Sequence, residues 1–248
     1  MLLRRLGRLA ELSAGEAEDV RLRCNDRRQH AARSELYGEG ALCPARFILS
    51  GWGARHHILS DGRRQIVSLL LPGDLVGPSL QPRLPSACSG VALTAMETID
   101  VAPLAEHAYA VAPAQSGLSR AFHLLDRLDE AAARNQIVRL GRQTAYERTL
   151  HLLLELRDRL APPGLAGTGL EETGLEGIGL EVPDRYVMPL TQEVLADVLG
   201  ITVVHVNRTL QQARREGLIE LKAGSVTLRQ TNLIEAVADW HPIPKMAD

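Results

Sequence analysis

The sequence predicts an α+β protein with a β-roll at its N-terminal end, a long helix after it, and a winged helix-turn-helix at its C-terminal end. Three observations support this fold class. Residues 35–103 alternate short apolar runs with turn residues, residues 116–160 contain no proline, and residues 190–228 join two helical patterns to a hairpin pattern. The predicted domains are residues 1–115, 116–141 and 142–248 of the 248-residue chain.

The first domain has the pattern of short strands separated by tight turns. Turn residues follow the apolar runs closely, as in Ser60-Asp61-Gly62 and Pro72-Gly73-Asp74. This pattern is typical of a compact β-barrel or roll. The opening twelve residues are amphipathic but short, and they predict a surface helix and not a signal peptide. The predicted strands are residues 47–50, 56–59, 65–71, 91–94 and 97–101.

A long helix is predicted from residue 116 onward. A small barrel can cover only part of such a helix, so we predict a parallel homodimer through about residues 116–140. Packing of the apolar stripe on the chain's own barrel is the alternative. Gly141 is the predicted hinge before a second helix over residues 144–160. The heptad-like stripe consists of Leu118, Phe122, Leu125 and Ala132, with Leu124, Leu128 and Val138 beside it.

Residues 190–217 predict two helices joined by a tight turn. Thr191 is expected to cap the first helix and Thr202 the second, because a threonine hydroxyl accepts hydrogen bonds from N–H groups at a helix start. Gly200 is expected to adopt the left-handed conformation that ends the first helix. The exposed face of the second helix is predicted to present Val203, Val204, His205, Asn207 and Arg208.

Arginine and asparagine on such a face are suited to base edges and phosphates in the major groove of DNA. We therefore predict that this second helix binds double-stranded DNA, with Thr191 and Thr202 also in contact. An ordinary helical hairpin is the alternative. It shares the caps and the apolar stripe, but it rarely combines Ala196, Gly200 and Ile201 in this order.

Residues 218–221 and 226–228 predict two short strands around a glycine-bearing turn. A β-hairpin after a DNA-reading helix is a wing, and Lys222 and Ser225 near its tip are the predicted phosphate contacts. The alternative is a hairpin that only covers the helices, with Lys222 in solvent.

The composition of the chain argues against several classes of protein and of binding site. The net charge of −2 and the pI near 6.5 exclude a uniformly basic nucleic-acid binder, so DNA contact needs a local basic patch. Cys24, Cys43 and Cys88 lack the spacing of a zinc or iron–sulfur site, which favours reduced thiols in a cytoplasmic protein. No segment approaches the roughly 18 apolar residues of a membrane span, so no membrane partner is expected. A glycine-rich pentapeptide repeat within residues 162–183 predicts an inserted acidic loop.

Several of these segments together resemble the Crp/Fnr family of bacterial transcription regulators, over about residues 10–240. The resemblance implies a homodimer whose β-roll senses a signal and whose paired helices bind a two-fold-related operator. RNA polymerase is a further expected partner if the protein is an activator. By their positions in the family, Val203, Val204 and Arg208 are expected to contact DNA bases, and Thr202 and His205 are expected to lie nearer the phosphates. The segments that carry it are residues 58–66, 72–77, 145–148, 152–156 and 190–219.

The resemblance also implies an effector pocket in the β-roll, and it shows departures there. Cyclic-AMP-binding members place a glutamate after the glycine of residues 72–77 and an Arg-Ser pair further on. Here Pro78 follows that glycine, and Ser86-Ala87 stand at the Arg-Ser positions, so cyclic-AMP control is not expected. The pocket candidates are Gly73, Asp74, Gly77, Arg83 and Ser86, of which Arg83 is the nearby candidate to replace the missing arginine.

No cofactor, metal site or catalytic residue is predicted. Haem-binding members of the family exist, and a haem- or other ligand-dependent regulator on the same fold is the alternative function. Its candidate ligands are His56, His57 and Cys88, but adjacent strand histidines face opposite ways, which favours a partly exposed histidine without iron. An enzyme built on the barrel lacks a metal-binding histidine motif, a phosphate loop and a nucleophile elbow. A protein-interaction module without DNA binding is disfavoured by Asn207 and Arg208.

Overall fold

A computed structural model describes residues 1–42, 45–77, 85–110, 116–160 and 184–241. The chain forms two compact units, Met1–Gln136 and Ile137–Asp248, and the boundary between them falls inside helix α4 (Gly117–Arg142). The predicted loop at residues 162–183 lies outside the described residues. None of the described helices is both long enough and apolar enough to cross a membrane.

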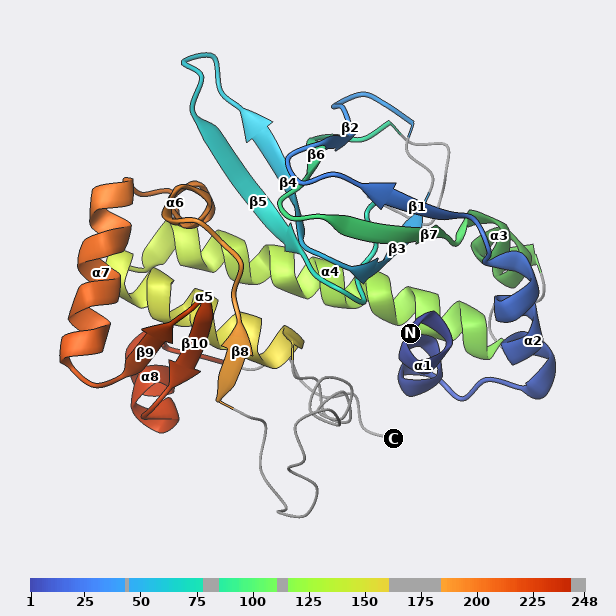
Figure 1. The fold of residues 1–248 in the computed structure, drawn as a ribbon. Coiled ribbons are helices and arrows are strands. Elements are labelled where there is room, and N and C mark those ends of the chain that lie inside the picture. Colours follow the sequence, from blue (N-terminus) through green and yellow to red (C-terminus); the bar gives the residue numbers. More distant parts are fainter. Residues whose placement is uncertain (43–44, 78–84, 111–115, 161–183, 242–248) are drawn as a thin grey trace. The chain divides into compact units, whose positions relative to one another are not determined.

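The first unit contains two antiparallel sheets, so the predicted β-roll is confirmed (Figure 1). The five strands predicted from the sequence correspond to β3 to β7, with bounds that differ by a few residues. One sheet has the order β1 (Arg27–His30), β7 (Met96–Asp100), β3 (Arg46–Ser50). The other has the order β2 (Glu35–Tyr37), β6 (Ser89–Ala92), β4 (Gly53–Ile58), β5 (Arg64–Leu70).

Three helices accompany the sheets, namely α1 (Leu2–Leu9), α2 (Ala14–Arg23) and α3 (Ala102–Ala110). Helix α2 begins with a capping box, in which Ser13 and Glu16 exchange backbone-to-side-chain hydrogen bonds. The Glu16 carboxylate also accepts hydrogen bonds from the Ser116 hydroxyl (2.8 Å) and the Leu118 N–H (3.0 Å). Burial alone would raise the pKa of Glu16, but these hydrogen bonds lower it to about 2. One carboxylate therefore links the starts of α2 and α4.

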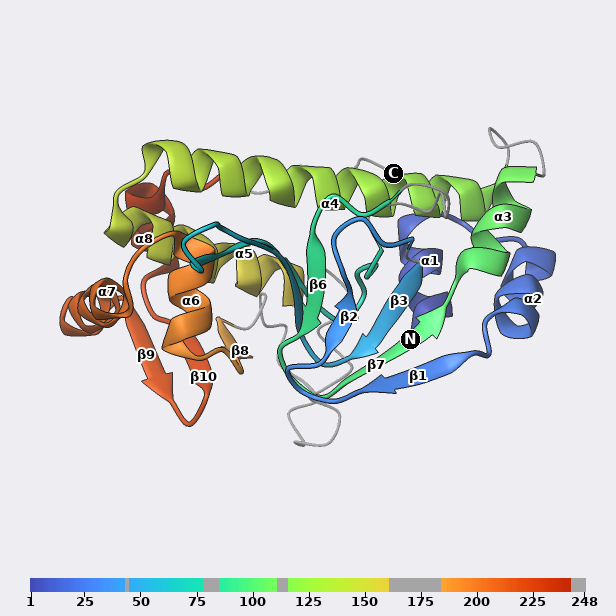
Figure 2. The same ribbon diagram turned by 90° about the horizontal axis from the view of Figure 1, so that it is seen from above.

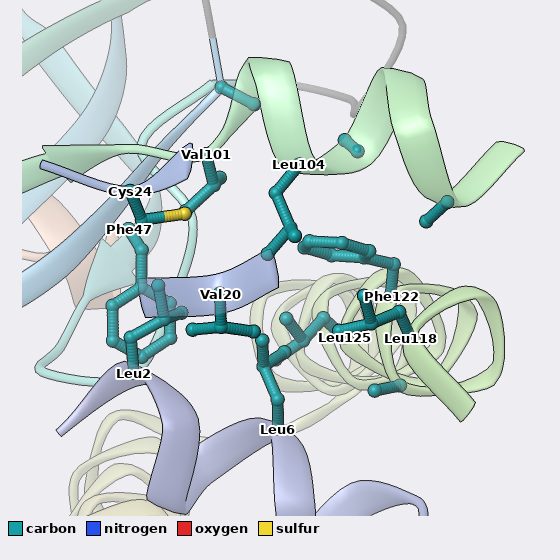
Figure 3. Close-up of a cluster of buried hydrophobic side chains, with 14 of the residues drawn as sticks. Leu2, Leu6, Val20, Cys24, Phe47, Val101, Leu104, Leu118, Phe122 and Leu125 are labelled. Carbon is teal, nitrogen blue, oxygen red and sulfur yellow. The ribbon is translucent and has the colours of Figure 1, made fainter. Parts of the chain in front are cut away.

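One hydrophobic cluster of the first unit lies between its helices and the β-roll (Figure 3). Leu118, Phe122 and Leu125 of α4 pack there with apolar side chains of α1, α2, α3 and β3. Ala132 is buried as well. The prediction that this stripe needs a partner chain is therefore wrong for Leu118, Phe122 and Leu125, because side chains of α1, α2, α3 and β3 cover them. The neighbouring residues differ, since Leu124 and Leu128 are half-buried and Val138 is 51% exposed.

The second unit is built around α5 (Ala145–Leu160), which packs against α6, α7 and α8. Helix α4 passes through Gly141 without interruption and ends at Arg142 (Figure 2), so the hinge predicted at Gly141 is misplaced. The break lies at residues 143–144, where the Thr144 N–H donates to Glu147 (2.7 Å) and starts α5. The other elements are β8 (Arg185–Val187), α6 (Gln192–Leu199), α7 (Val203–Arg215), β9 (Ile219–Lys222), β10 (Ser225–Leu228) and α8 (Thr231–Ala238).

Candidate nucleic-acid interface

Helices α6 and α7 start and end where the sequence predicts. The Thr191 hydroxyl accepts a hydrogen bond from the Val194 N–H (3.2 Å), and the Thr202 hydroxyl accepts one from the His205 N–H (3.3 Å). Each is an N-cap, which satisfies a backbone donor that has no partner within its own helix. Gly200 has a φ of 63°, the left-handed conformation expected at the end of α6. The predicted helix-turn-helix is thus present.

Helix α7 has one buried side and one exposed side. The buried side carries Val206 and Leu210, with relative exposures of 0% and 5%. Packing of this apolar side fixes the opposite side toward solvent. Val204 has a relative exposure of 73%, the highest of the large apolar side chains of the helix. An apolar side chain in this position gains no free energy from burial. The cap and the first two turns expose Thr202, Val203, Val204, His205, Asn207 and Arg208, and Gln211, Arg214 and Arg215 are exposed further along the helix.

An open hollow is present on the exposed side of α7. It is lined by Val203, Val204, Asn207 and Arg208, and by Gln192 at the start of α6. The Asn207 amide approaches the Gln192 side-chain oxygen at 3.5 Å. Sequence reasoning missed Gln192, although its place directly after the capping Thr191 puts it at the exposed end of α6. The hollow therefore combines two apolar side chains with hydrogen-bonding groups of both helices.

Two contacts hold α7 on α5. The Thr149 and Thr209 hydroxyls share a buried hydrogen bond (3.0 Å). The Tyr146 hydroxyl donates to the carboxylate of Glu216, which follows the last residue of α7. Burial and the negative charge of Glu216 raise the pKa of Tyr146, so its hydroxyl remains a donor. These contacts fix the middle and the end of α7, while the Thr202 cap fixes its start.

The predicted hairpin follows α7. Strands β9 and β10 are antiparallel, with Lys222 opposite Ser225. The two residues between them, Ala223 and Gly224, have φ values of 48° and 77°, as a tight two-residue turn with the twist of the strands requires. Lys222 is exposed and Ser225 is half-buried. The sequence did not predict β8, which pairs with the other edge of β10 and makes the wing three-stranded.

FixK from Bradyrhizobium diazoefficiens, a nitrogen fixation regulation protein, is 31% identical to this chain over 198 residues, which cover 77% of the chain and 72% of FixK. The chain belongs to the Crp/Fnr family of bacterial transcription regulators. FnrL from Cereibacter sphaeroides, a transcriptional activator protein, is 32% identical over 184 residues, which cover 71% of the chain and 64% of FnrL. The model of a Crp-like helix-turn-helix domain matches residues 147–237.

Solved structures share this fold. FixK2 from Bradyrhizobium japonicum matches with a TM-score of 0.69 and 24% identity, over 86% of this chain and 96% of FixK2. A CRP-family transcriptional regulator from Thermus thermophilus matches with a TM-score of 0.58 and 20% identity, over 86% of this chain and 97% of that protein. The relatives and the matched Crp-like helix-turn-helix domain show that this Crp/Fnr chain is a DNA-binding transcription regulator and not an enzyme.

Two of the predicted effector-pocket residues, Gly73 and Asp74, form the turn after β5. Gly73 has a φ of 100°, which favours glycine, and its N–H donates to the Ile48 carbonyl (3.0 Å). The Asp74 carboxylate accepts a hydrogen bond from the Leu71 N–H (2.8 Å). In this Crp/Fnr protein both residues hold the turn together.

Gly77 and Ser86 flank a segment outside the described residues, and the predicted Arg83 falls in that segment. The buried Ser86 hydroxyl donates to the Cys88 carbonyl (2.6 Å), so its proton has a partner within the chain. The Gly77 carbonyl accepts a hydrogen bond from Nη2 of Arg55 (3.2 Å). The structure thus brings an arginine of β4 to the backbone of Gly77, one of the predicted pocket residues.

Sequence reasoning missed Arg55. Its Nη1 donates to both carboxylate oxygens of Asp129 on α4, each at 2.7 Å, and its Nη2 also donates to the Leu75 carbonyl (3.0 Å). Burial opposes the charge of Arg55, but the carboxylate of Asp129 outweighs this and raises its pKa. Arg55 lies just before the predicted strand 56–59, and only the structure shows that it belongs to β4 and is buried.

The candidate haem ligands lie on β4 and β6 or just before them. His56 is buried, whereas His57 is half-exposed, with its Nδ1 3.5 Å from a carboxylate oxygen of Glu39. Cys88 is buried and not in a disulfide. Within the described part of the chain, no group of three or more His, Cys, Asp or Glu side chains is arranged to hold a metal ion.

Proposed function

We propose that this protein binds a two-fold-related operator as a homodimer, with α7 of each copy in a major groove, and that cyclic AMP does not control it. The main support for this proposal is the exposed face of α7. The helix is capped by Thr202 and held on α5, and its exposed face borders a hollow lined by Gln192, Val204 and Arg208.

The chemistry of the face suggests separate roles for its residues. Arg208 can pair with the O6 and N7 atoms of guanine, and the valines can contact thymine methyl groups. Asn207, with Gln192 beside it, offers an amide to a neighbouring base edge. We assign phosphate contacts, which position the protein without reading sequence, to Thr191, Thr202, His205, Lys222 and Ser225.

A second copy of the chain is the proposed partner of α4. Leu124, Leu128, Ala131 and Val138 are partly exposed, and their spacings of four, three and seven residues follow the seam of a coiled coil. This face is distinct from the stripe that the first unit buries. Paired α4 helices would place two α7 helices in successive major grooves, about 34 Å or 10–10.5 base pairs apart.

Independence from cyclic AMP rests on chemistry at the effector-pocket position. The hydroxyl of Ser86 is already engaged by a backbone carbonyl, and the guanidinium of Arg55 is neutralised by Asp129. A cyclic phosphate would find neither a free hydroxyl nor an uncompensated positive charge in these groups. The relative FnrL is an activator by name, and we extend activation, with RNA polymerase as partner, to this chain.

Selection of duplexes from a random-sequence pool by the full chain tests the proposal. We expect enrichment of a two-fold-symmetric sequence with half-site centres about 10–10.5 base pairs apart, without added cyclic AMP. Unrelated or asymmetric sequences would contradict it. Calorimetric titration with cyclic AMP should detect no submillimolar binding, and tight binding that improves DNA affinity would overturn the last part of the proposal.

The dimer is tested with two variants of α4. Leu128→Glu places a charge in the proposed seam and should give monomers at micromolar concentration, whereas Ala133→Glu, at an exposed position off the seam, should leave the dimer intact. Light scattering measures both. A monomeric wild-type protein, or equal behaviour of the two variants, would exclude this seam.

A further inference from the structure

The end of α4 is held firmly within the second unit. Arg139 pairs with Glu155 of α5, and both side chains are buried. The Gln143 amide donates to the Ala238 carbonyl at the end of α8 (2.8 Å) and lies 2.9 Å from Nδ1 of His151. These contacts tie the last residues of α4, and the residue after them, to two further helices of the DNA-binding unit.

Arg148 of α5 makes the contact that reaches the helix-turn-helix. Its Nε donates to the Gln143 carbonyl (2.8 Å) and its Nη2 to the Leu140 carbonyl (2.9 Å), both at the end of α4. Its Nη1 donates to the Leu199 carbonyl (3.0 Å), at the last residue of α6. One guanidinium therefore joins the ends of two helices.

The chemistry of these groups makes the link specific. The last four carbonyls of a helix have no partner within the helix and carry its partial negative charge, so a cation there is stabilising. The planar guanidinium presents its donors in a fixed fork, which sets the relative positions of all three carbonyls. A lysine ammonium has no such fork and cannot hold three carbonyls in this arrangement.

Leu199, which accepts the hydrogen bond from Arg148, lies close to the start of α7. Gly200 and Ile201 follow it directly, and Thr202 then caps α7. Arg148 therefore joins the end of α4 by hydrogen bonds to the residue that precedes the turn into α7.

We propose that Arg148 is a positioning residue that couples the end of α4 to α7, and so sets how strictly the two α7 helices of a dimer demand one half-site spacing. This inference rests on the proposed function, because it requires a dimer on a two-fold operator. It adds that the spacing preference depends on a residue that itself contacts no base.

The test uses the full chain and a duplex selected from random DNA by the wild-type protein. Three forms of that duplex are compared, namely the full site, a single half-site, and the full site with one base pair inserted at its centre. The insertion turns one half-site by about 34° relative to the other, a misfit that a rigid dimer cannot follow. Wild-type protein should bind the inserted site at least about tenfold more weakly than the full site, because simultaneous engagement depends on geometry.

Arg148→Met should leave half-site affinity within about threefold of wild type, weaken full-site binding about tenfold, and remove most of the penalty of the insertion. Arg142→Met is the matched control. It removes a guanidinium from the end of α4 that is exposed and has no hydrogen bond or ion pair among the described residues, and it should retain the wild-type insertion penalty. If Arg148→Met does not fold, Arg148→Lys is measured on the same three duplexes. We expect this variant to lose part of the affinity penalty that the inserted base pair causes.

Equal losses on the half-site and the full site would show that Arg148 only stabilises the fold, and the inference would be wrong. An undiminished insertion penalty would overturn it as well. A wild-type protein that selects no symmetric duplex would instead refute the proposed function, so the two failures are distinguishable.

Discussion

Each unit of this regulator holds one part of α4 with an arginine–carboxylate pair, and the two pairs differ in their contact with solvent. In the first unit Arg55 binds Asp129, whose side chain is 41% exposed. In the second unit Arg139 binds Glu155, and their side chains are only 2% and 5% exposed. Glu155 also accepts a hydrogen bond from Arg159 (3.0 Å).

The difference in exposure should determine how much stability is lost when one partner of a pair is removed. In the first pair water reaches the Asp129 carboxylate, and Arg55, although buried, keeps the Leu75 and Gly77 carbonyls as partners. The second pair has no such access, so loss of one partner leaves a buried charge. Burial alone would raise the pKa of Glu155, but the charges of Arg139 and Arg159 lower it below its usual range. Breaking the pair that holds α4 in the second unit should therefore cost more stability than breaking the pair in the first unit.

The two tryptophans of the chain report on the two units separately. Trp52 is buried in the first unit and Trp240 in the second. Replacement of either by phenylalanine leaves a single tryptophan, so its fluorescence measures the free energy of unfolding of one unit in the full chain.

Glu155→Gln should have the largest effect. It removes the negative charge but preserves the shape, so Arg139 remains buried without its carboxylate, and the second unit should lose about 3–5 kcal/mol of unfolding free energy. Denaturant titration followed by Trp240 fluorescence measures this loss. The control, Arg139→Met with Glu155→Gln, removes the buried charge as well and should lose less than the single variant. A loss below about 1 kcal/mol in the single variant would break the comparison.

Acid should destabilise the second unit through His151. Burial, followed by the charge of Arg139, lowers the pKa of His151 to about 4, although Glu155 and Asp239 act in the opposite direction. The unfolded chain binds the proton near pH 6.5 and the folded chain only near pH 4. This contribution is therefore complete above pH 6.5 and is lost as the pH falls toward 4, which amounts to about 2–3 kcal/mol.

Unfolding titrations between pH 7 and pH 4.5, followed by Trp240, check this dependence. His151 contacts Trp240 edge to face, with ring centroids 4.8 Å apart. His151→Gln cannot take up the proton, so its stability should change less over this range than that of the wild type. If both proteins showed the same pH dependence, His151 would not be the group responsible.

Asp129→Asn should have the smallest effect of the three. Its partner Arg55 keeps the carbonyls of Leu75 and Gly77, and water reaches the exposed side chain, so we expect a loss of about 1–2 kcal/mol in the first unit. Denaturant titration followed by Trp52 measures it. A loss as large as that of Glu155→Gln would mean that solvent exposure does not distinguish the two pairs.

Local chemistry explains which parts of the fold were predictable. The helix-turn-helix depends on caps at Thr191 and Thr202 and on the left-handed Gly200, and each of these signals lies within a few residues of the feature it determines. Strand β1, with the sequence Arg-Arg-Gln-His, has no apolar alternation and was not predicted. Helix α2 buries only Val20, so it also lacks a stripe.

The error in α4 has a different origin. Its sequence carries two apolar faces, and periodicity cannot tell which face meets which partner. Leu118 and Phe122 are covered by helices α1 to α3, and of these only α1 was predicted. Arg55 and Arg148 were missed for the same reason, since Asp129, the ion-pair partner of Arg55, and Leu199, which Arg148 reaches on α6, lie 74 and 51 residues away in the sequence.

The central claim is that α7 reads sequence while the wing only holds phosphate, and one measurement tests it most directly. Arg208→Ala and Lys222→Ala are titrated against the selected duplex and random DNA at two salt concentrations. Arg208→Ala should lose about 1–3 kcal/mol per half-site on the selected duplex and little on random DNA. Lys222→Ala should weaken binding to both alike and reduce the salt dependence. If Arg208→Ala behaved like Lys222→Ala, Arg208 would be a phosphate contact and the assignment of base reading to α7 would be contradicted.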